Sequence, residues 1–409
     1  MMTETVVIDA MGAQGDGIAE NGGFIPFTLP GETVSIERHG KEVILTDVLK
    51  ASESRRQPPC PHFGPAGDLC GGCATQHADD GFYRRWKRQL VVDALVSRGI
   101  KTETAELHIC EPGARRRIVL TARKTGEGPV LGFNQAGSHT VFALQRCLVA
   151  TDGLNRKLGD LRALLQHIPG KSLRMTALET ETGLDVAISG GPALRPPQRQ
   201  AAVAEALKRD IARLSCNDEI LIEPRKPVLQ FGKASVTPPP GGFVQAVLQA
   251  EKTMTNLVLA HLKKTKRVAD LFSGCGTFAL ALAGQSAVHA VESDGPSLAA
   301  LDRAARHTPG LKPVTSEKRD LYRRPLTRNE LKTFDGVTFD PPRAGAEQQC
   351  LEIAASTVRR VAAISCNPVT LARDLEILTT AGFEVTSVTP IDQFLWSPHV
   401  EVVALLERK

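Results

Sequence analysis

The chain has 409 residues, of which 42% are apolar and 23% charged, values typical of a soluble globular protein. This length is too great for one ordinary hydrophobic core, so we expect two or three domains. No apolar run approaches the roughly 18 residues that a membrane span requires, and the first residues lack a secretory pattern. We therefore expect a cytoplasmic protein with no membrane partner, acting as a monomer.

The net charge of +5 is modest, but the basic residues are clustered. Clusters of arginine and lysine occur at residues 55–56, 84–88, 115–117 and 263–267. Such clusters can neutralise phosphates and attract a polyanion, although each one alone is also typical of a solvated surface. Together they favour a nucleic-acid partner.

Residues 1–54 contain short runs of strand-forming residues separated by glycine-rich turns. The runs lie at 5–8, 23–27, 33–36 and 42–45. So many strands in so short a segment predict an OB-like β-barrel, a common platform for nucleic acids. A purely structural barrel is the alternative.

Residues 55–240 form the second predicted region, which begins with loops and cysteines. An amphipathic helix is predicted over 82–98, and mixed α+β structure over 107–235. We recognise no catalytic constellation in this region. The proline- and glycine-rich stretch 237–242 breaks any regular element and marks a domain boundary.

Residues 241–409 alternate between predicted strands and helices. Strands are predicted at 268–271, 287–291, 336–339 and 361–365, and helices at 277–283, 296–306, 348–359 and 371–381, before a closing pair of β segments. This alternation predicts a doubly wound, Rossmann-like α/β sheet, which binds ligands at the carboxyl ends of its strands.

Two features near the start of this sheet predict a cofactor site. A glycine-rich turn follows the first strand, and Glu292 ends the next, where it could accept hydrogen bonds from ribose hydroxyls. These features also fit a dinucleotide fingerprint, so an NAD-dependent oxidoreductase is an alternative. The motif Asp340-Pro341-Pro342 instead favours a methyltransferase loop. Arg343 occupies the place of the aromatic residue typical of amine methylation, which argues against that reaction.

Cys366 follows a predicted strand, at the same sheet edge as the Asp-Pro-Pro motif. A buried structural cysteine is the alternative. Uracil C5 is a poor nucleophile, but a thiolate that adds to C6 makes an enolate whose C5 can attack a sulfonium methyl. A second group must then remove the C5 proton. Glu401 is the candidate, although a lone glutamate in a terminal strand would ordinarily lie on the surface.

Three of the nine cysteines are close in sequence, and a fourth lies far downstream. In a cytosolic protein such a group indicates a metal or catalysis rather than disulfides. Four thiolates suit a [4Fe–4S] cluster. Zinc is an equal alternative by spacing, although only one Cys-x2-Cys pair is present. The four residues are Cys60, Cys70, Cys73 and Cys147.

Taken together, these motifs resemble the bacterial 23S ribosomal RNA 5-methyluridine methyltransferases over nearly the whole chain. Residues 15–19 and 29–32 look like the TRAM domain of that family. The other matches are Cys70-Gly71-Gly72-Cys73, Asp270-Leu271-Phe272, Asp340-Pro341-Pro342-Arg343, Ser365-Cys366-Asn367-Pro368 and His399-Val400-Glu401. The resemblance implies methyl transfer from S-adenosylmethionine to C5 of a specific uridine in 23S ribosomal RNA, through an adduct between Cys366 and C6.

The resemblance also assigns roles to single residues. It implies that Cys366 is the nucleophile, that Glu401 is the proton acceptor, and that the 82–98 helix docks on the catalytic domain. It implies a [4Fe–4S] cluster on Cys60, Cys70, Cys73 and Cys147. It implies contacts with S-adenosylmethionine from Gln245, Phe272, Thr277, Glu292, Asp320 and Asp340.

The sequence departs from the family pattern in places. Nine residues separate the first two cysteines where five are usual, so we expect an insertion within 63–69, and Ser273 replaces a usual cysteine. A transfer-RNA 5-methyluridine methyltransferase is one alternative, but such enzymes lack the TRAM domain and the cluster. A non-catalytic RNA-binding or ribosome-assembly factor is another, although the presence of both Cys366 and Glu401 counts against it.

Overall fold

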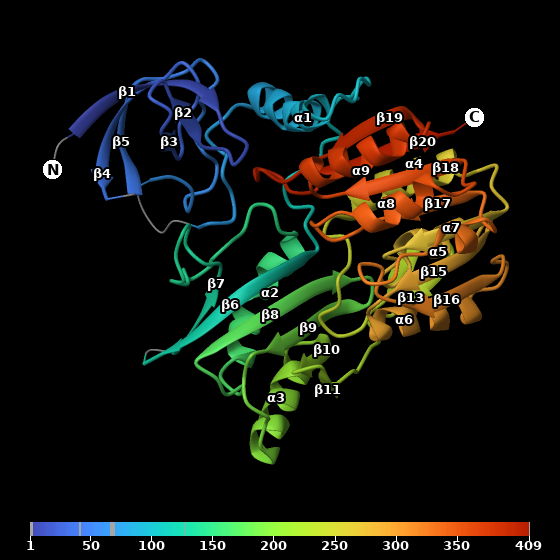
Figure 1. The fold of residues 1–409 in the computed structure, drawn as a ribbon. Helices are drawn as coiled ribbons and strands as arrows, with labels where there is room; N and C mark the ends of the chain where they lie inside the picture. The colour runs from blue at the N-terminus through green and yellow to red at the C-terminus, as the bar shows by residue number, and fades with distance from the viewer. Residues whose placement is uncertain (1–2, 41, 66–69, 127, 409) are drawn as a thin grey trace.

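The computed structural model describes residues 3–40, 42–65, 70–126 and 128–408, and these form three large β-sheets and one two-stranded sheet. Figure 1 shows the three large sheets following one another along the chain, with helices against the second and third. No helix in the described part of the chain has both the length and the apolarity that crossing a bilayer requires.

The first sheet is antiparallel and has the strand order β3-β2-β1-β4-β5. Its strands are β1 (Thr3–Met11), β2 (Gly17–Ala19), β3 (Phe24–Ile25), β4 (Thr33–His39) and β5 (Glu42–Lys50). Its apolar core includes Ile8, Ile25 and Val34. The four predicted runs all lie in or overlap strands, and β2 was not predicted. Closure of this sheet into an OB-like barrel remains a prediction.

Helix α1 (Asp80–Ser97) lies between the first and second sheets in the sequence. The Asp79 side chain caps its first turn by accepting a hydrogen bond from the Phe82 N–H, so the helix begins two residues before the predicted start. Val91 and Leu95 belong to the same apolar core as the third sheet. The helix therefore packs against the C-terminal part of the chain.

The second sheet is mixed and has the order β11-β10-β9-β8-β6-β7, with β9 and β10 parallel. Its strands are β6 (Arg117–Thr125), β7 (Gly128–Gly132), β8 (Ser172–Thr180), β9 (Gly183–Ser189), β10 (Ile211–Cys216) and β11 (Glu219–Ile222). Helices α2 (Asp152–Leu164) and α3 (Pro196–Lys208) accompany it. The α2 residues Leu154 and Leu161 are buried in the same core as the sheet, as expected for α+β structure. A short hairpin of β12 (Leu229–Phe231) and β13 (Ala234–Val236) follows.

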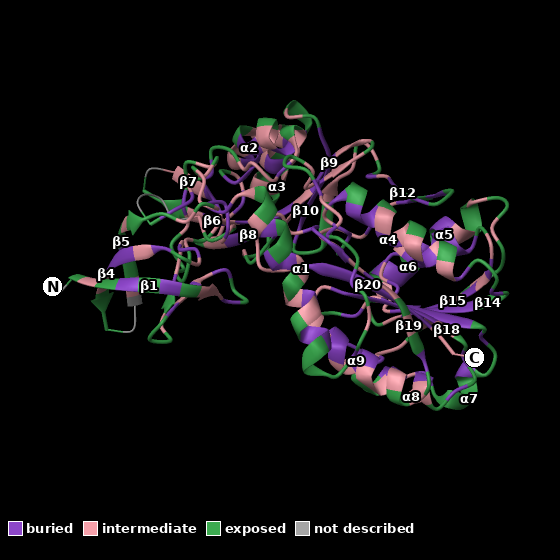
Figure 2. Cartoon of the chain, turned by 90° about the horizontal axis from the view of Figure 1, so that it is seen from above, coloured by how far each residue is buried: buried purple, intermediate pink, exposed green. Residues whose placement is uncertain are grey.

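The third sheet has seven strands in the order β16-β15-β14-β17-β18-β20-β19, parallel except at β20. The strands are β14 (Arg267–Leu271), β15 (Ala287–Glu292), β16 (Val314–Lys318), β17 (Gly336–Phe339), β18 (Arg360–Ser365), β19 (Glu384–Ile391) and β20 (Glu401–Glu407). The helices are α4 (Leu248–His261), α5 (Thr277–Leu282), α6 (Gly295–His307), α7 (Arg328–Leu331), α8 (Glu347–Ala354) and α9 (Pro368–Thr380). Figure 2 shows α4, α5 and α6 on one side of the buried strands and α7, α8 and α9 on the other. The prediction of a doubly wound α/β sheet is confirmed.

Two details of this region differ from the prediction. The helix expected over 348–359 ends at Ala354, because the Ser356 hydroxyl donates to the Ile353 carbonyl and accepts from the Val358 N–H, which forms a turn. Helix α9 begins three residues early, because the Asn367 side chain accepts from the Val369 N–H. Helix α4 and strand β16 were not predicted.

Candidate active site

A cavity of about 890 Å³, here called the catalytic cavity, lies at the carboxyl ends of the parallel strands. Parallel strands bring their carboxyl ends to one edge, so residues distant in sequence meet there. All eight residues proposed for catalysis or cofactor binding line it: Gln245, Phe272, Thr277, Glu292, Asp320, Asp340, Cys366 and Glu401.

The turn between β14 and α5 forms one end of the catalytic cavity. Phe272 adopts a left-handed conformation (φ 59°), which is uncommon for a residue with a side chain and is often found at functional sites. Gly276 has φ 97°, and a Cβ there would lie 2.9 Å from Leu280 and Leu301, so glycine is required. The buried Ser273 hydroxyl has no hydrogen-bond partner among the described residues. An unpaired buried hydroxyl in a cavity wall can bind a polar ligand.

Acidic side chains line the same end of the cavity. The Glu292 carboxylate, at the end of β15, accepts hydrogen bonds from the backbone N–H groups of Gly274 (2.9 Å), Ser293 (2.6 Å) and Asp294 (2.8 Å). It therefore fixes the glycine-rich turn as well as facing the cavity. Asp320 follows β16 and accepts a hydrogen bond from the Tyr322 N–H (3.0 Å). Together these acids can accept hydrogen bonds from hydroxyl groups of a ligand.

Asp340 and Glu401 bring two carboxyl groups into the deeper part of the cavity. Asp340 follows β17 and accepts a hydrogen bond from the Gln245 amide at 2.9 Å. Burial raises the pKa of Asp340, and the hydrogen bond from Gln245 opposes that shift. Burial also raises the pKa of Glu401 well above its ordinary value, and the nearby Asp340 charge adds to the effect.

Glu401 is buried, with 3% of its surface exposed, rather than lying on the surface as a terminal glutamate ordinarily would. The reason is topological, because β20 is inserted between β18 and β19 and is not an edge strand. Its Oε1 atom is buried and has no hydrogen-bond partner in the described part of the chain. This oxygen is therefore available to accept a proton from a ligand.

Cys366 directly follows β18 and is half-buried. Burial, with a smaller contribution from the Glu401 and Asp340 charges, raises the pKa of its thiol to about 11, and Arg343 opposes the shift. The Asn367 amide donates to the Arg343 carbonyl at 3.1 Å, so the loops after β17 and β18 are joined. A thiol beside carboxyl groups can act as a nucleophile once it loses its proton.

The four cysteines proposed as metal ligands line a second cavity of about 300 Å³, here called the cysteine cavity. Burial, with a smaller contribution from the neighbouring thiols, raises the pKa of Cys73 to about 12. In the described ranges, however, no group of three or more cysteine, histidine or acidic side chains is arranged to hold a metal ion. Part of the predicted insertion, residues 66–69, lies outside the described residues. The donor chemistry therefore fits a cluster, whereas a closed ligand set is not observed.

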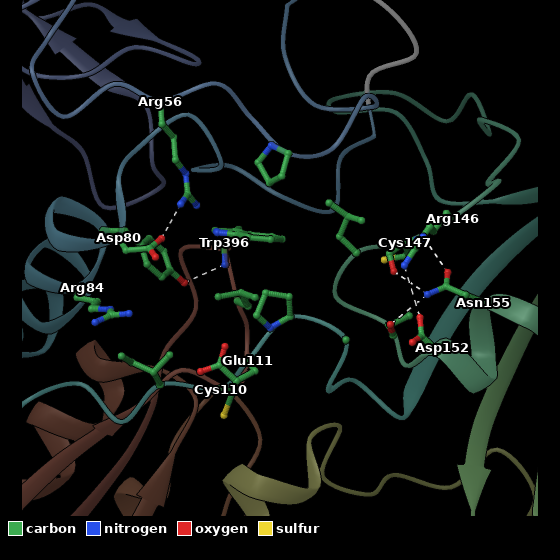
Figure 3. Close-up of a pocket in the computed structure, with 18 residues that line it drawn as sticks. Arg56, Asp80, Arg84, Cys110, Glu111, Arg146, Cys147, Asp152, Asn155 and Trp396 are labelled. Carbon is green, nitrogen blue, oxygen red and sulfur yellow. Dashed lines mark hydrogen bonds and ion pairs between the residues drawn. The ribbon is translucent and has the colours of Figure 1, made fainter.

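A third cavity, of about 470 Å³, lies between α1, the loop at residues 109–113 and the start of α2. Figure 3 shows Trp396 near its centre, with Arg56 on one side and Arg146 on the other. Arg56 pairs with Asp80 at 2.6 Å, and Arg146 lies 3.5 Å from Asp152. Arg56 and Arg146 are thus already paired, and although Cys110, Glu111 and Cys147 also line this cavity, none of the eight residues proposed for catalysis or cofactor binding does.

Sequence reasoning missed two polar residues beside the catalytic cavity, Asp392 and Gln393. Asp392 is buried and forms an ion pair with Lys87 of α1. Gln393 is also buried and donates a hydrogen bond to Glu401 at 3.0 Å. Two adjacent polar residues directly after Pro390 and Ile391, at the end of β19, were the available signal.

Comparison with known proteins agrees with this geometry. The family model for tRNA (uracil-5-)-methyltransferases matches residues 239–409. A protein of Rhizobium meliloti named an uncharacterized RNA methyltransferase is 53% identical, over 100% of both chains. A 23S rRNA (uracil(1939)-C(5))-methyltransferase of Shewanella halifaxensis is 29% identical, over 98% of this chain and 94% of its own.

The fold also has a match among solved structures. The tRNA (uracil-54, C5)-methyltransferase of Pyrococcus abyssi, in complex with S-adenosyl-L-homocysteine, superposes with a TM-score of 0.74. It is 20% identical, and the match covers 98% of this chain and 100% of that one. The resemblance drawn from the sequence motifs is confirmed. The chain therefore belongs to a family of RNA methyltransferases, and its residues 239–409 match the tRNA (uracil-5-)-methyltransferase model.

Proposed function

We propose that this protein methylates C5 of a specific uridine in 23S ribosomal RNA through a covalent adduct between Cys366 and C6. The observation that carries the proposal is the meeting of Cys366, Glu401 and Asp340 in one cavity. The ribosomal target is supported by the Shewanella halifaxensis relative, which aligns over nearly its whole length.

Six residues would hold the cofactor at the other end of the catalytic cavity: Gln245, Phe272, Thr277, Glu292, Asp320 and Asp340. The fit is supported by the unpaired Ser273 hydroxyl in the cavity wall. When bound, S-adenosylmethionine supplies an electrophilic methyl group. The remaining chemistry belongs to the side chains of the chain itself.

Cys366 begins the reaction and Glu401 ends it. The Cys366 thiol loses its proton to solvent, and its sulfur forms a bond to C6 while the C5–C6 π electrons move toward the O4 carbonyl as an enolate. C5 would then take the methyl group as the bond between that group and the sulfonium sulfur breaks, and the electron pair of the broken bond would stay on that sulfur. Glu401 removes the proton from C5, the electrons of that C–H bond restore the C5–C6 double bond, and the S–C6 bond breaks to return the thiolate.

We further propose a division of the chain into three functional parts. Residues 1–54 form a TRAM domain that binds RNA, residues 55–240 carry the cluster, and residues 241–409 form the methyltransferase domain, on which α1 docks. The division is supported by the separate sheets and by the burial of Val91 and Leu95 in the core of the third sheet.

The cysteine cavity is proposed to hold a [4Fe–4S] cluster with a structural or RNA-docking role, because no step above needs an electron. The proposal is supported by four thiols from distant segments lining one cavity. Iron and acid-labile sulfide should each be about four per chain in protein purified without oxygen. Stoichiometric zinc in place of iron would overturn this assignment.

The reaction is tested with labelled S-adenosylmethionine and total RNA from cells that lack the protein. Nucleoside analysis should find the label in 5-methyluridine, and fractionation should place it in 23S ribosomal RNA. Label in transfer RNA alone would overturn the proposed target. No label, with protein purified anaerobically, would overturn the proposed activity.

A further inference from the structure

We infer that Gln393 is a positioning residue for this reaction, which orients the Glu401 carboxyl group to take the C5 proton. The inference rests on the proposed function of Glu401. Gln393 lies in the loop between β19 and β20, and 3% of its surface is exposed. A glutamine buried beside an acid must make specific hydrogen bonds, and these define its role.

The hydrogen bonds of Gln393 fix the orientation of its amide. Its Nε2 donates to Glu401 Oε2 at 3.0 Å and to Gln245 Oε1 at 2.8 Å. Its Oε1 accepts from the backbone N–H of Val247 at 3.4 Å. The reversed amide would place its oxygen against two acceptors and its nitrogen against a donor. The observed orientation is therefore the one that satisfies all three neighbours.

The backbone on either side of Gln393 is also held. The preceding residue, Asp392, is buried, pairs with Lys87, and accepts a hydrogen bond from the Tyr83 hydroxyl at 2.8 Å. The Asp392 N–H donates to the His108 carbonyl at 2.8 Å. Gln393 therefore presents its amide to Glu401 from a rigid support, which is what a positioning residue requires.

Gln393 and Gln245 together separate two buried carboxyl groups. Gln245 donates to Asp340 and Gln393 donates to Glu401, so each carboxylate receives an amide N–H. Asp340, from the loop after β17, acts on both Glu401 and Cys366, whereas Arg343 and Glu401 itself act on the thiol. Burial and Asp340 raise the pKa of Glu401, and the hydrogen bond from Gln393 lowers it. Gln393 thus favours the ionised form that can accept a proton.

Loss of this hydrogen bond should affect one step more than the others. Bond formation between Cys366 and C6, and methylation of C5, do not use Glu401 as a base. Removal of the C5 proton does, and it precedes the release of the thiolate. A variant without the Gln393 amide should therefore accumulate the methylated adduct between the protein and RNA.

The test compares Gln393→Met with the matched control Gln349→Met in the full chain. Gln349 is equally buried, with 1% exposed, and hydrogen-bonds the backbone of Leu326 away from the catalytic cavity. Each variant is mixed with RNA from cells lacking the protein and with methyl-labelled S-adenosylmethionine. Labelled protein–RNA adduct that survives denaturation is then followed over time and across pH.

We expect release from the adduct to slow about tenfold at neutral pH in Gln393→Met, because a hydrogen bond to a charged group is lost. Release should also reach its half-maximal rate at a higher pH, because the pKa of Glu401 rises when the donor is removed. Gln349→Met should release product at the wild-type rate and with the wild-type pH profile. Gln393→Asn keeps a buried amide but is one methylene shorter, so it should show the same changes to a smaller extent.

Wild-type release by both Gln393→Met and Gln393→Asn at every pH would overturn the inference. The Asn variant decides the matter if the Met variant does not fold, as judged by circular dichroism. Failure of the proposed function would look different, since wild type and Glu401→Gln would then both form no labelled adduct. Adduct in Glu401→Gln together with normal release in the Gln393 variants would overturn the inference alone.

Discussion

The catalytic cavity and the cysteine cavity both contain thiols and share one wall residue, Phe394, yet they are built differently. Strand ends of a parallel sheet supply most of the catalytic cavity, whereas loops supply most of the cysteine cavity. The Arg115 guanidinium lies 5.7 Å from the Phe394 ring and also lines the cysteine cavity. The two cavities are therefore neighbours across a single aromatic wall.

The chemical surroundings of the thiols differ more than their burial. In the catalytic cavity one thiol, Cys366, lies among carboxyl groups and an arginine. In the cysteine cavity the thiols lie near one another, and burial together with the neighbouring thiols raises the pKa of Cys70 and Cys73. A single thiol beside unlike groups can react and be regenerated, whereas several thiols together suit a bound cation or cluster.

The largest expected effect separates the two kinds of thiol. Cys366→Ala should lower the rate of 5-methyluridine formation by about 10⁴-fold or more, as removal of a covalent nucleophile does in other enzymes. Cys147→Ala should lower the yield of folded protein while leaving 5-methyluridine as the product. Labelled methyl transfer with nucleoside analysis measures the rate and identifies the product, and circular dichroism of the purified protein measures the folded yield. Undiminished methylation by Cys366→Ala would show that Cys366 is not the nucleophile, and the catalytic cavity would then not differ from the cysteine cavity in holding a reactive thiol.

The second effect concerns the buried ion pair between Lys87 and Asp392, which lies near Phe394, the residue shared by the two cavities. Lys87→Met should lower the free energy of unfolding by about 3–5 kcal/mol, because it leaves Asp392 buried without its cation. The chain has two tryptophans, and Trp86 and Trp396 both lie beside this pair, so fluorescence during urea unfolding reports on it.

A surface ion pair provides the control for that measurement. Arg98 and Glu376 lie 3.1 Å apart with 42% and 45% of their side chains exposed. Arg98→Met should cost less than about 1 kcal/mol, because solvent screens the pair. Equal losses in the two variants would show that the Lys87 pair does not support the wall.

The third effect uses the pH dependence of alkylation. The pKa of Cys366 is raised to about 11, so its thiolate fraction, and its rate of alkylation by iodoacetamide, should rise about tenfold per pH unit between pH 7 and 10. Arg343→Met should slow alkylation several-fold, because the arginine lowers the pKa of the thiol. Glu401→Gln should speed it, because the carboxylate raises that pKa. Mass spectrometry of the Cys366 peptide measures each rate, and opposite shifts would contradict this account.

Sequence periodicity predicted the third sheet well because its strands are buried on both faces and its turns contain glycine or proline. The strand predicted at 336–339 has the observed bounds of β17, and those at 268–271, 287–291 and 361–365 each differ by one residue. The eight proposed site residues meet because parallel strands share an edge, which the alternation of elements already implied.

The features that sequence could not provide depend on strand order and on loops. The burial of Glu401 follows from insertion of β20 between β18 and β19, which no local pattern encodes. The pairing of Lys87 with Asp392 joins residues more than three hundred positions apart. Gln393 was missed for a similar reason, because two of its three partners, Gln245 and Val247, lie in a segment about 150 residues earlier in the chain.

The smallest effect tests the unpaired hydroxyl at the cofactor end. Ser273→Ala should leave the free energy of unfolding unchanged or raise it by up to about 1 kcal/mol, because a buried donor without a partner is removed. It should weaken binding of S-adenosylmethionine about fivefold, the effect of one neutral hydrogen bond. Isothermal titration calorimetry and urea unfolding measure the two quantities.

Thr338→Val is the matched control, since the Thr338 hydroxyl is also buried without a partner among described residues but does not line the catalytic cavity. Thr338→Val should likewise leave the free energy of unfolding unchanged or slightly raised, and it should not change the affinity for S-adenosylmethionine. If Ser273→Ala binds S-adenosylmethionine as tightly as the control does, the hydroxyl makes no contact with the cofactor. A loss of affinity confined to Ser273→Ala would mean that the Ser273 hydroxyl, unpaired within the protein, binds S-adenosylmethionine.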